Sequence, residues 1–218
     1  MKIIDLSIEF GTGSNYHLDT EISDHVTHAE TKHRLEYPAE GFAVKRLVMS
    51  DHSGTHVDAP AHFIPGGKTI EQTPVDIYVG AAKVVDFSGE KGNEGELKLP
   101  VFQDKISDEG IEIEAGDCVL FKFQGKTVKV YSGLSEEVSA FLAEQKVRLV
   151  GTDQPSIDWS ENKTRPAHRV LLSSAIPIVE MLTNLELLKG KKSTFMGLPL
   201  KMTGATGSPI RAVAIENV

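Results

Sequence analysis

Histidine is distributed unevenly along this chain of 218 residues. Three of its eight histidines, His52, His56 and His62, lie in one short segment, with Asp58 among them. Imidazole nitrogens and carboxylate oxygens are common ligands for zinc and related divalent metals. Residues 52–62 therefore predict a metal site, and the chain must fold so that these side chains meet at one point.

The spacing within this segment suits a β-strand. His52, Gly54, His56 and Asp58 are separated by two residues each, so on a strand they would face one side. The Cα atoms of His56 and Asp58 would then lie about 6–7 Å apart, a suitable distance for binding one ion. Those of His52 and His56 would lie about 13 Å apart, which is long for one metal. Either the chain bends at Gly54, which glycine permits, or two metals share the site.

The end of this predicted strand places the third histidine. Pro60 stops the strand because proline cannot donate to a sheet ladder, and Ala59 before it is held extended. His62 would therefore lie near the metal but off the ligand face. A neutral imidazole there could accept a proton from a water whose pKa the metal has lowered.

Several neighbouring polar and aromatic residues have less specific roles. We expect Ser53 and Thr55 to make local backbone hydrogen bonds, and Phe63 to form either an apolar wall of the site or part of the core. In the turn-rich stretch 151–158, three polar residues are expected to fix the loop or support the site rather than catalyse. They are Asp153, Ser156 and Asp158.

Five segments have the β-branched content and the Gly, Pro or Asp boundaries that predict strands. They are residues 43–49, 82–87, 117–123, 147–150 and 210–215. One clear helix is predicted by apolar residues on a single helix face, namely Leu134, Val138, Phe141 and Leu142. A shorter helix is predicted for residues 180–188, with Leu182, Leu185 and Leu188 facing inward. Because strands outnumber helices and some alternate with them, the predicted class is α/β or α+β with a mixed sheet.

Residues 11–45 form the least regular part of the chain. They contain His17, His25, His28 and His33, but the spacing of these histidines matches no ligand template. We interpret the stretch as a long loop or arm, because loops of that length are usually functional or docked on a partner. A plain surface loop is the alternative.

Composition bounds the class of protein. The chain has 40% hydrophobic and 25% charged residues, the usual globular mix, and it is long enough to bury a core, so we expect one domain over 1–218. A net charge of −8 argues against nucleic acid and anionic membranes as partners. The single cysteine, Cys118, lies in an apolar run and indicates buried filler in a reducing cytoplasm. The N-terminus does not resemble a signal peptide, and no apolar run approaches the roughly 18 residues of a membrane span.

The whole string of residues 52–62, His-x-Gly-Thr-His-x-Asp-Ala-Pro-x-His, resembles the signature of the cyclase family, also called the kynurenine formamidase-like metal hydrolases. The likeness continues in order along most of the chain, except residues 11–45 and the segment after Lys122. It is carried by residues 4–7, 115–120, 151–158, 168–172, 176–180 and 182–185.

The resemblance implies a swivelling β/β/α domain with a mixed central sheet and an N-terminal arm. It also implies a homodimer or larger homo-oligomer in which the arm reaches the neighbouring subunit's site, with one or two zinc or manganese ions per chain. His52, His56 and Asp58 would be metal ligands, and His62 the catalytic acid/base. His168 and Glu180 would complete a second metal position. From the residues alone, we would interpret His168 as a surface residue and Glu180 as a charge at a helix start.

Members of this family hydrolyse amides and lactams beside aromatic rings, such as N-formylkynurenine and isatin, or lactones. We therefore expect a small-molecule amide hydrolase, acting on an aryl-formamide or a cyclic amide. A lactone or ester hydrolase is one alternative, and a non-catalytic metal-binding module is another, although a pure binding site would not need His62.

Two departures from the family pattern affect the substrate rather than the metal. The usual Pro-Gly-Asp stretch is absent from residues 8–45. After Gly116-Asp117, the usual Thr-Gly step is replaced by Lys122-Phe123 and a shortened connection. In relatives both regions line the substrate pocket.

Overall fold

The computed structural model describes residues 1–9, 11, 20–89, 95–123 and 130–216. Within these residues, one mixed sheet has the strand order β1-β13-β11-β5-β7-β9-β10-β4-β12. Its strands are β1 Lys2–Asp5, β4 His56–Asp58, β5 Val79–Asp86, β7 Cys118–Lys122, β9 Leu149–Thr152, β10 Ile178–Glu180, β11 Ser193–Met196, β12 Gly207–Pro209 and β13 Val213–Glu216. This sheet confirms the α/β class.

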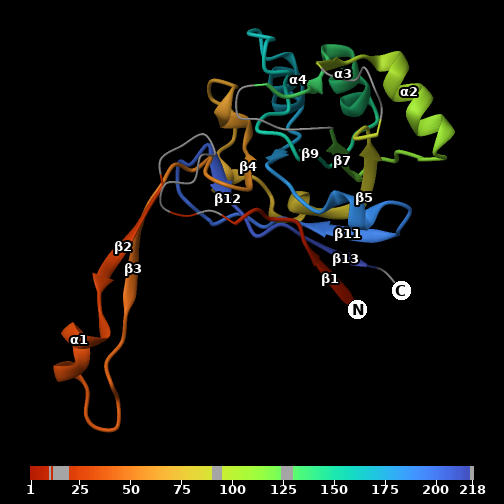
Figure 1. Cartoon of the computed structure of the whole chain (residues 1–218). Helices are drawn as coiled ribbons and strands as arrows, with labels where there is room; N and C mark the ends of the chain where they lie inside the picture. The colour runs from red at the N-terminus through yellow and green to blue at the C-terminus, as the bar shows by residue number, and fades with distance from the viewer. Residues whose placement is uncertain (10, 12–19, 90–94, 124–129, 217–218) are drawn as a thin grey trace.

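Three α-helices lie together beside the sheet (Figure 1). They are α2 Leu99–Asp108, α3 Glu136–Glu144 and α4 Pro166–Ser173. A short parallel pair, β6 Glu96–Leu97 and β8 Gly133–Leu134, accompanies them. The body also contains the 3-10 helices η2 Pro60–His62, η3 Ile70–Gln72, η4 Val75–Tyr78 and η5 Leu185–Leu188.

The four central strands β5, β7, β9 and β10 run parallel. Parallel neighbours need crossover connections, and α2, α3 and α4 lie in these connections. Both faces of β7 are covered: Leu120 packs in the cluster that contains Phe195, and Phe121 in the cluster that contains Phe102 of α2. Burial on both faces explains why this strand is a continuous apolar run, in which Cys118 is fully buried as expected.

Most predicted elements of the body are present. Residues 82–87, 117–123 and 147–150 fall on β5, β7 and β9. The predicted helix is α3, where the Ser135 hydroxyl caps the N-terminus by accepting from the Val138 N–H. The segment 210–215 joins the sheet only from Val213. Helices α2 and α4 escape prediction because each is short and has a proline in its first turn, so few apolar positions display the helical period.

The helix predicted for residues 180–188 is wrong. Ile178–Glu180 is strand β10, and only Leu185–Leu188 is helical, as a 3-10 turn. Between them, Met181 and Asn184 have φ angles of 62° and 58°, in the left-handed region that interrupts a right-handed helix. Leu182, Leu185 and Leu188 are buried as expected, so the spacing identified the buried face but not the element.

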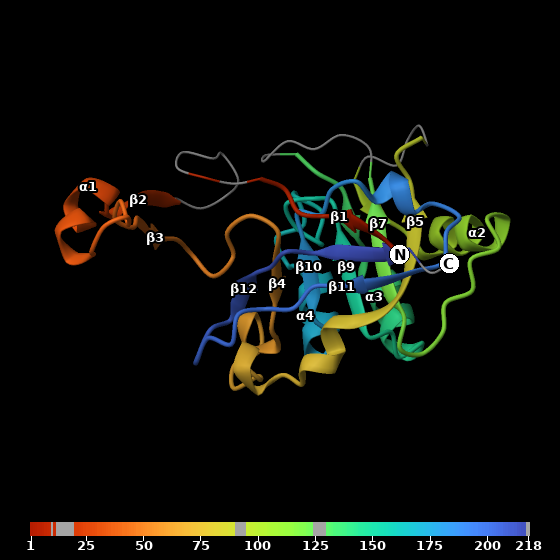
Figure 2. The same ribbon diagram turned by 90° about the horizontal axis from the view of Figure 1, so that it is seen from below.

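Residues 20–48 form an arm that projects from the body (Figures 1 and 2). The prediction of an irregular stretch is wrong for its described part, because β2 Glu21–Val26 and β3 Val44–Val48 pair as an antiparallel ribbon. Helix α1 His28–Thr31 and the 3-10 helix η1 Lys32–Arg34 lie toward its far end. The strand predicted at 43–49 is therefore real, but it belongs to the arm and not to the central sheet. His17 lies outside the described residues.

The arm exposes many large apolar side chains. Those at least 38% exposed are Ile22, Leu35, Tyr37, Phe42, Val44, Leu47 and Val48. A two-stranded ribbon is marginally stable by itself in water. The arm thus presents an apolar surface that the described part of the same chain does not cover.

Candidate metal centre

The central element of the candidate site is β4. It lies between β10 and β12, with His56 opposite Glu180 on β10, and Asp58 opposite Gly207 on β12. Because side chains alternate along a strand, His56 and Asp58 share one face, while Val57 points into the core. This pairing also brings Glu180 to the face that carries His56.

His52 reaches the same face through a turn. The predicted strand from 52 to 58 begins only at His56, and Gly54 has a φ of +64°, in the left-handed region that glycine adopts at low cost. The ring centroids of His52 and His56 are 5.2 Å apart. Of the two alternatives for this pair, the bend at Gly54 is the one the chain adopts.

His168 enters the site from α4. It is only 4% exposed, in contrast to the surface position that the residues alone suggest. Its Nδ1 lies 2.5 Å from an Asp158 oxygen, and Asp158 also accepts hydrogen bonds from the backbone N–H groups of Ala167 and His168. Asp158 thus caps the start of the helix and orients the ring, which agrees with its expected supporting role.

The side chains converge on Asp58. Its Oδ1 lies 2.7 Å from Nδ1 of His52 and 3.4 Å from Nε2 of His56, and its Oδ2 lies 3.4 Å from Nε2 of His168. Glu180 closes the other side, with oxygens 3.5 Å from His56 Nε2 and 3.4 Å from His168 Nε2. One carboxylate therefore lies among three imidazoles, two from its own segment and one from the distant helix α4.

The charges of this cluster are strongly coupled. Burial disfavours a charged imidazole, but the nearby carboxylates outweigh it and raise the pKa of His56 to about 10 and that of His168 well above its usual value. Burial also disfavours the carboxylates, yet the imidazoles hold the pKa of Asp58 well below its usual value and lower that of Glu180 to about 2. The site thus favours positive charge, carried either by protons on the imidazoles or by a metal ion in their place.

The donor set suits a divalent metal. Oδ2 of Asp58 is buried and has no hydrogen-bond partner within the described part of the chain, although a buried carboxylate oxygen normally has one. Candidate ligand atoms of His52, His56 and Asp58 lie within 4.8 Å of one another, as do those of Asp58, His62 and His168. Nitrogen and carboxylate donors in such groups fit zinc or manganese.

His62 lies beside the cluster on η2, beyond the end of β4. Its ring centroid is 4.0 Å from that of His52 and 5.7 Å from that of His168. Burial lowers the pKa of His62 below its usual value, so the ring is neutral near pH 7. Phe63 stacks on His168 at 4.4 Å and meets His62 edge-on, which gives the site an aromatic side. It also packs against the core cluster, so it takes both of the roles that were considered for it.

Other predicted residues have structural contacts. Thr55 donates to the Met181 carbonyl and accepts from the Ile8 N–H. These are hydrogen bonds to the backbone, as expected, but they join distant parts of the chain and are not local. The arm histidines His25, His28 and His33 belong to none of the candidate metal groups found among the described residues.

Three residues that support the site carry no recognisable signal in the sequence, namely Asp51, Thr206 and Gly207. Thr206 and Gly207 lie far from the histidine segment along the chain and contact it only because β12 pairs with β4. Asp51 is adjacent to His52, but an acidic residue next to a histidine is no signal by itself. Only knowledge of the strand pairing could have identified this group.

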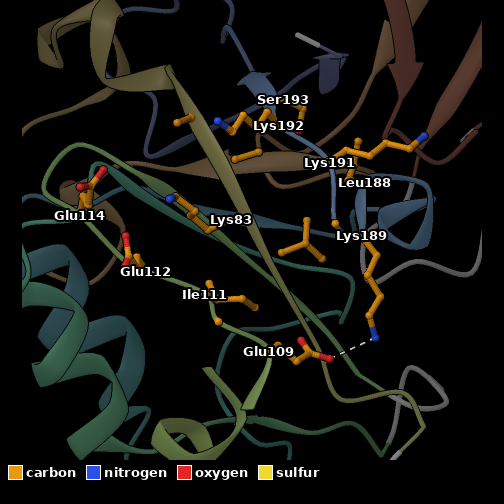
Figure 3. Close-up of a pocket in the computed structure, with 15 residues that line it drawn as sticks. Lys83, Glu109, Ile111, Glu112, Glu114, Leu188, Lys189, Lys191, Lys192 and Ser193 are labelled. Atoms are coloured by element: carbon orange, nitrogen blue, oxygen red, sulfur yellow. Dashed lines mark ion pairs between the residues drawn. The ribbon is translucent and has the colours of Figure 1, made fainter. Parts of the chain in front are cut away.

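A cleft of about 710 Å³ opens away from this cluster, between β5, the segment after α2 and the turn before β11 (Figure 3). It is lined largely by lysines and glutamates, and Lys189 lies 3.1 Å from Glu109. It shares no residue with the candidate metal groups, and no histidine lines it within the described residues. The cleft is therefore separate from the candidate metal groups.

Comparisons with known proteins agree with this geometry. The chain matches the family described as "Putative cyclase" over residues 4–159. It is 35% identical over 175 residues to the kynurenine formamidases of Bacillus mycoides (strain KBAB4) and Bacillus cereus (strain ATCC 14579), with 78% of each chain covered.

Solved structures share the fold. Isatin hydrolase A from Labrenzia aggregata bound to benzyl benzoate superposes with a TM-score of 0.81 at 23% identity, covering 98% of this chain and 93% of that one. A structure described as a potential metal-dependent hydrolase with cyclase activity gives a TM-score of 0.72 at 24% identity, covering 100% and 98%. In the part of the chain that the structure describes, no helix has the length and apolar character needed to cross a membrane.

Proposed function

Because this chain belongs to the putative cyclase family, we propose that it is a metal-dependent hydrolase that cleaves a carbon–nitrogen bond in a small, non-peptide amide. The observation that carries the proposal is the buried Oδ2 of Asp58, which has no hydrogen-bond partner among the described residues and lies 3.4 Å from Nε2 of His168, in a cluster of three imidazoles and Glu180. The relatives point to the same chemistry, because kynurenine formamidases and isatin hydrolases both act on amides beside an aromatic ring. They favour neither a lactone hydrolase nor a non-catalytic module.

We assign the metal ligands from the contacts. His52, His56 and Asp58 would hold a first ion, and Asp58, His168 and Glu180 would hold a second where two are present, with Asp58 shared. The donors suit zinc or manganese. When bound, such an ion supplies Lewis-acid polarisation of the substrate carbonyl and lowers the pKa of a water molecule.

The protein's own side chains would handle the proton. His62 is neutral near pH 7 because burial lowers its pKa, so it can accept the proton of the attacking water and return it to the leaving nitrogen. Such a group must stand within hydrogen-bond reach of the reacting atoms, and His62 lies against His52 and near His168. The ring of Phe63 offers an apolar surface for an aryl group, which is consistent with an aryl-formamide or a cyclic aryl amide.

The test compares substrates and metals together. Purified protein would be stripped of metal, reloaded with zinc or manganese, and assayed against an aryl-formamide, isatin, an aryl lactone and an aryl ester. We expect metal-dependent turnover, fastest on one of the two amides. Full metal loading with no turnover on any of the four would contradict the proposed function.

The arm supports a further part of this proposal, a homodimer. Its exposed apolar side chains need a cover that the described part of the chain does not supply, and a second copy supplies one. We propose that the arm of one chain helps to close the other chain's site. We also propose that the protein is cytoplasmic. Deletion of residues 14–40 should leave metal binding intact, weaken the dimer and reduce turnover. Light scattering reports the mass, and a monomeric, fully active wild type would contradict the idea.

A further inference from the structure

Thr206, in the loop before β12, contacts Nε2 of His52, and Gly207, the first residue of that strand, lies against the His52 ring. We propose that Asp51, Thr206 and Gly207 are positioning residues that fix the tautomer and the place of the His52 ring, and so set the affinity of the first metal position. This inference rests on the proposed role of His52 as a ligand. It concerns residues 206–207, far from the histidine segment in sequence.

The tautomer follows from counting hydroxyl protons. The Thr206 hydroxyl donates to Oδ2 of Asp51 at 2.9 Å. A threonine hydroxyl has a single proton to donate, so toward Nε2 of His52, at 3.0 Å, Thr206 can only accept. Thr206 therefore favours the neutral tautomer of His52 that carries its hydrogen on Nε2 and leaves the lone pair on Nδ1, whereas Asp58 alone would favour a hydrogen on Nδ1.

That lone pair faces the metal side. Nδ1 of His52 lies 2.7 Å from Oδ1 of Asp58. With Nε2–H committed to Thr206, a neutral ring and an ionised Asp58 would present two acceptors to each other, which is unfavourable unless a cation stands beside both. A hydrogen bond to the outer nitrogen of a metal-bound histidine fixes its tautomer and orientation, and the Asp51–Thr206 pair provides one here.

The other two imidazoles follow the same arrangement, which supports the assignment for His52. Nδ1 of His56 is 2.8 Å from the Gly54 carbonyl oxygen, which can only accept. Nδ1 of His168 is 2.5 Å from a carboxylate oxygen of Asp158. In each ring one nitrogen is held by an acceptor and the other is left for Asp58 and its surroundings. At His52 the acceptor is a hydroxyl, that of Thr206, which is itself hydrogen-bonded to Asp51.

Asp51 also connects the Thr206 hydroxyl to the sheet through hydrogen bonds. Its Oδ2 accepts from the backbone N–H groups of Thr206 and Gly207, at 3.0 and 3.1 Å, besides the Thr206 hydroxyl. These three bonds join the turn before β4 to the start of β12. A carboxylate with three donors on one oxygen is held firmly, so the acceptor for His52 has a fixed position.

Gly207 leaves room for the His52 ring because it has no side chain. It stands opposite Asp58 in the β4–β12 register, so any side chain there would project onto the metal face. A Cβ atom at this position would lie 2.5–2.9 Å from three atoms of the His52 ring. The ring of His52 therefore occupies the space beside Asp58 that a side chain at 207 would otherwise fill.

The experiment measures zinc affinity by competition with a chromophoric chelator, in wild type and in Thr206→Val, Thr206→Ser, Gly207→Ala and Ser208→Ala. Ser208 is the matched control, because it is on the same strand opposite Val57, which points into the core. We expect Thr206→Val to bind zinc about 10–100-fold more weakly, the usual cost of losing such a support. Thr206→Ser should restore the affinity, Gly207→Ala should lose it, and Ser208→Ala should match wild type.

Two further measurements separate positioning from stability. Thermal unfolding of the metal-free proteins should give similar midpoints for Thr206→Val, Thr206→Ser and wild type, and the absorption spectrum of the cobalt-loaded protein should change in Thr206→Val alone. Wild-type affinity in Thr206→Val, or no rescue by Thr206→Ser, would overturn this inference while leaving the proposed function standing. A wild type that binds no zinc or manganese would overturn both.

Discussion

The metal face of β4 and the arm formed by β2 and β3 are neighbours in sequence but differ in how they are supported. The metal face has partners on both sides: β10, β12 and α4 bring Glu180, Gly207 and His168 to it, and the core lies beneath it. The arm has only its own two strands and exposes apolar residues such as Leu47 and Tyr37. The metal face is thus fully packed within one chain, whereas the arm needs another surface to cover its apolar side chains.

The sharpest test of this contrast removes the residue that joins both metal positions. Asp58→Ala should abolish binding of zinc and manganese, because every candidate ligand set includes Asp58. Elemental analysis after incubation with excess metal and gel filtration gives the occupancy. Leu47→Ser in the arm is the control variant, and it should keep the full metal content. Wild-type occupancy in Asp58→Ala would remove the basis for the site.

A smaller but still large effect is expected at His62. His62→Ala should retain the metal and lose roughly 10²–10⁴-fold in kcat, the usual contribution of general acid–base catalysis. Because the ligand atoms of His62 also fall within reach of Asp58 and His168, occupancy must be measured on the same sample. Metal loss in His62→Ala would make His62 a ligand rather than the proton acceptor.

The pH profile gives an independent check on the same residue. Burial lowers the pKa of His62 below its ordinary value near 6.5. Protonation stops the ring from accepting a proton, so kcat/KM should be constant near neutral pH and fall as pH drops through a value below 6.5. His62→Ala should lack this acidic limb. An acidic limb centred above 6.5 would contradict the buried, neutral imidazole.

Substitutions in the core of the body and in the arm should lower the free energy of unfolding by different amounts. Phe121 is fully buried beneath the helices, so Phe121→Ala should lower the free energy of unfolding by about 3–5 kcal/mol. Leu47 is 53% exposed, and Leu47→Ala should change it by about 0.5 kcal/mol or less in the monomer. Urea unfolding at low protein concentration measures both. Comparable losses would show that the arm is packed into the body's cooperative unit.

The sequence predicted these two regions unequally, and particular residues show why. His52 to His62 were identifiable because their chemistry is concentrated in one segment. The apolar run at Cys118–Phe121 predicted a strand and a buried cysteine, and both are present. Leucines at 182, 185 and 188 repeat every three residues, which imitates a helix, and no local signal revealed that Met181 and Asn184 would adopt left-handed angles.

Long-range supports were beyond local reasoning. Glu180 and Thr206 are placed by the pairing of β4 with β10 and β12, and pairing is a property of the whole sheet. His168 and Glu180 were assigned only through the family resemblance. The arm's ribbon was missed because β2 alternates polar and apolar residues weakly, with most of its side chains exposed.

The pairing of β4 with both neighbours has a consequence for how such a chain can change over evolution. Side chains alternate strictly along a strand, so a one-residue shift in the register of β4 against β10 and β12 would exchange the two faces of β4. His56 and Asp58 would then point into the apolar core, and Val57 would take their place. The segments on either side of β4 are constrained as well, because the turn before it carries His52 and the 3-10 helix after it carries His62. Related chains should therefore keep the length of the segment from His52 to His62, whereas the length of the arm can vary.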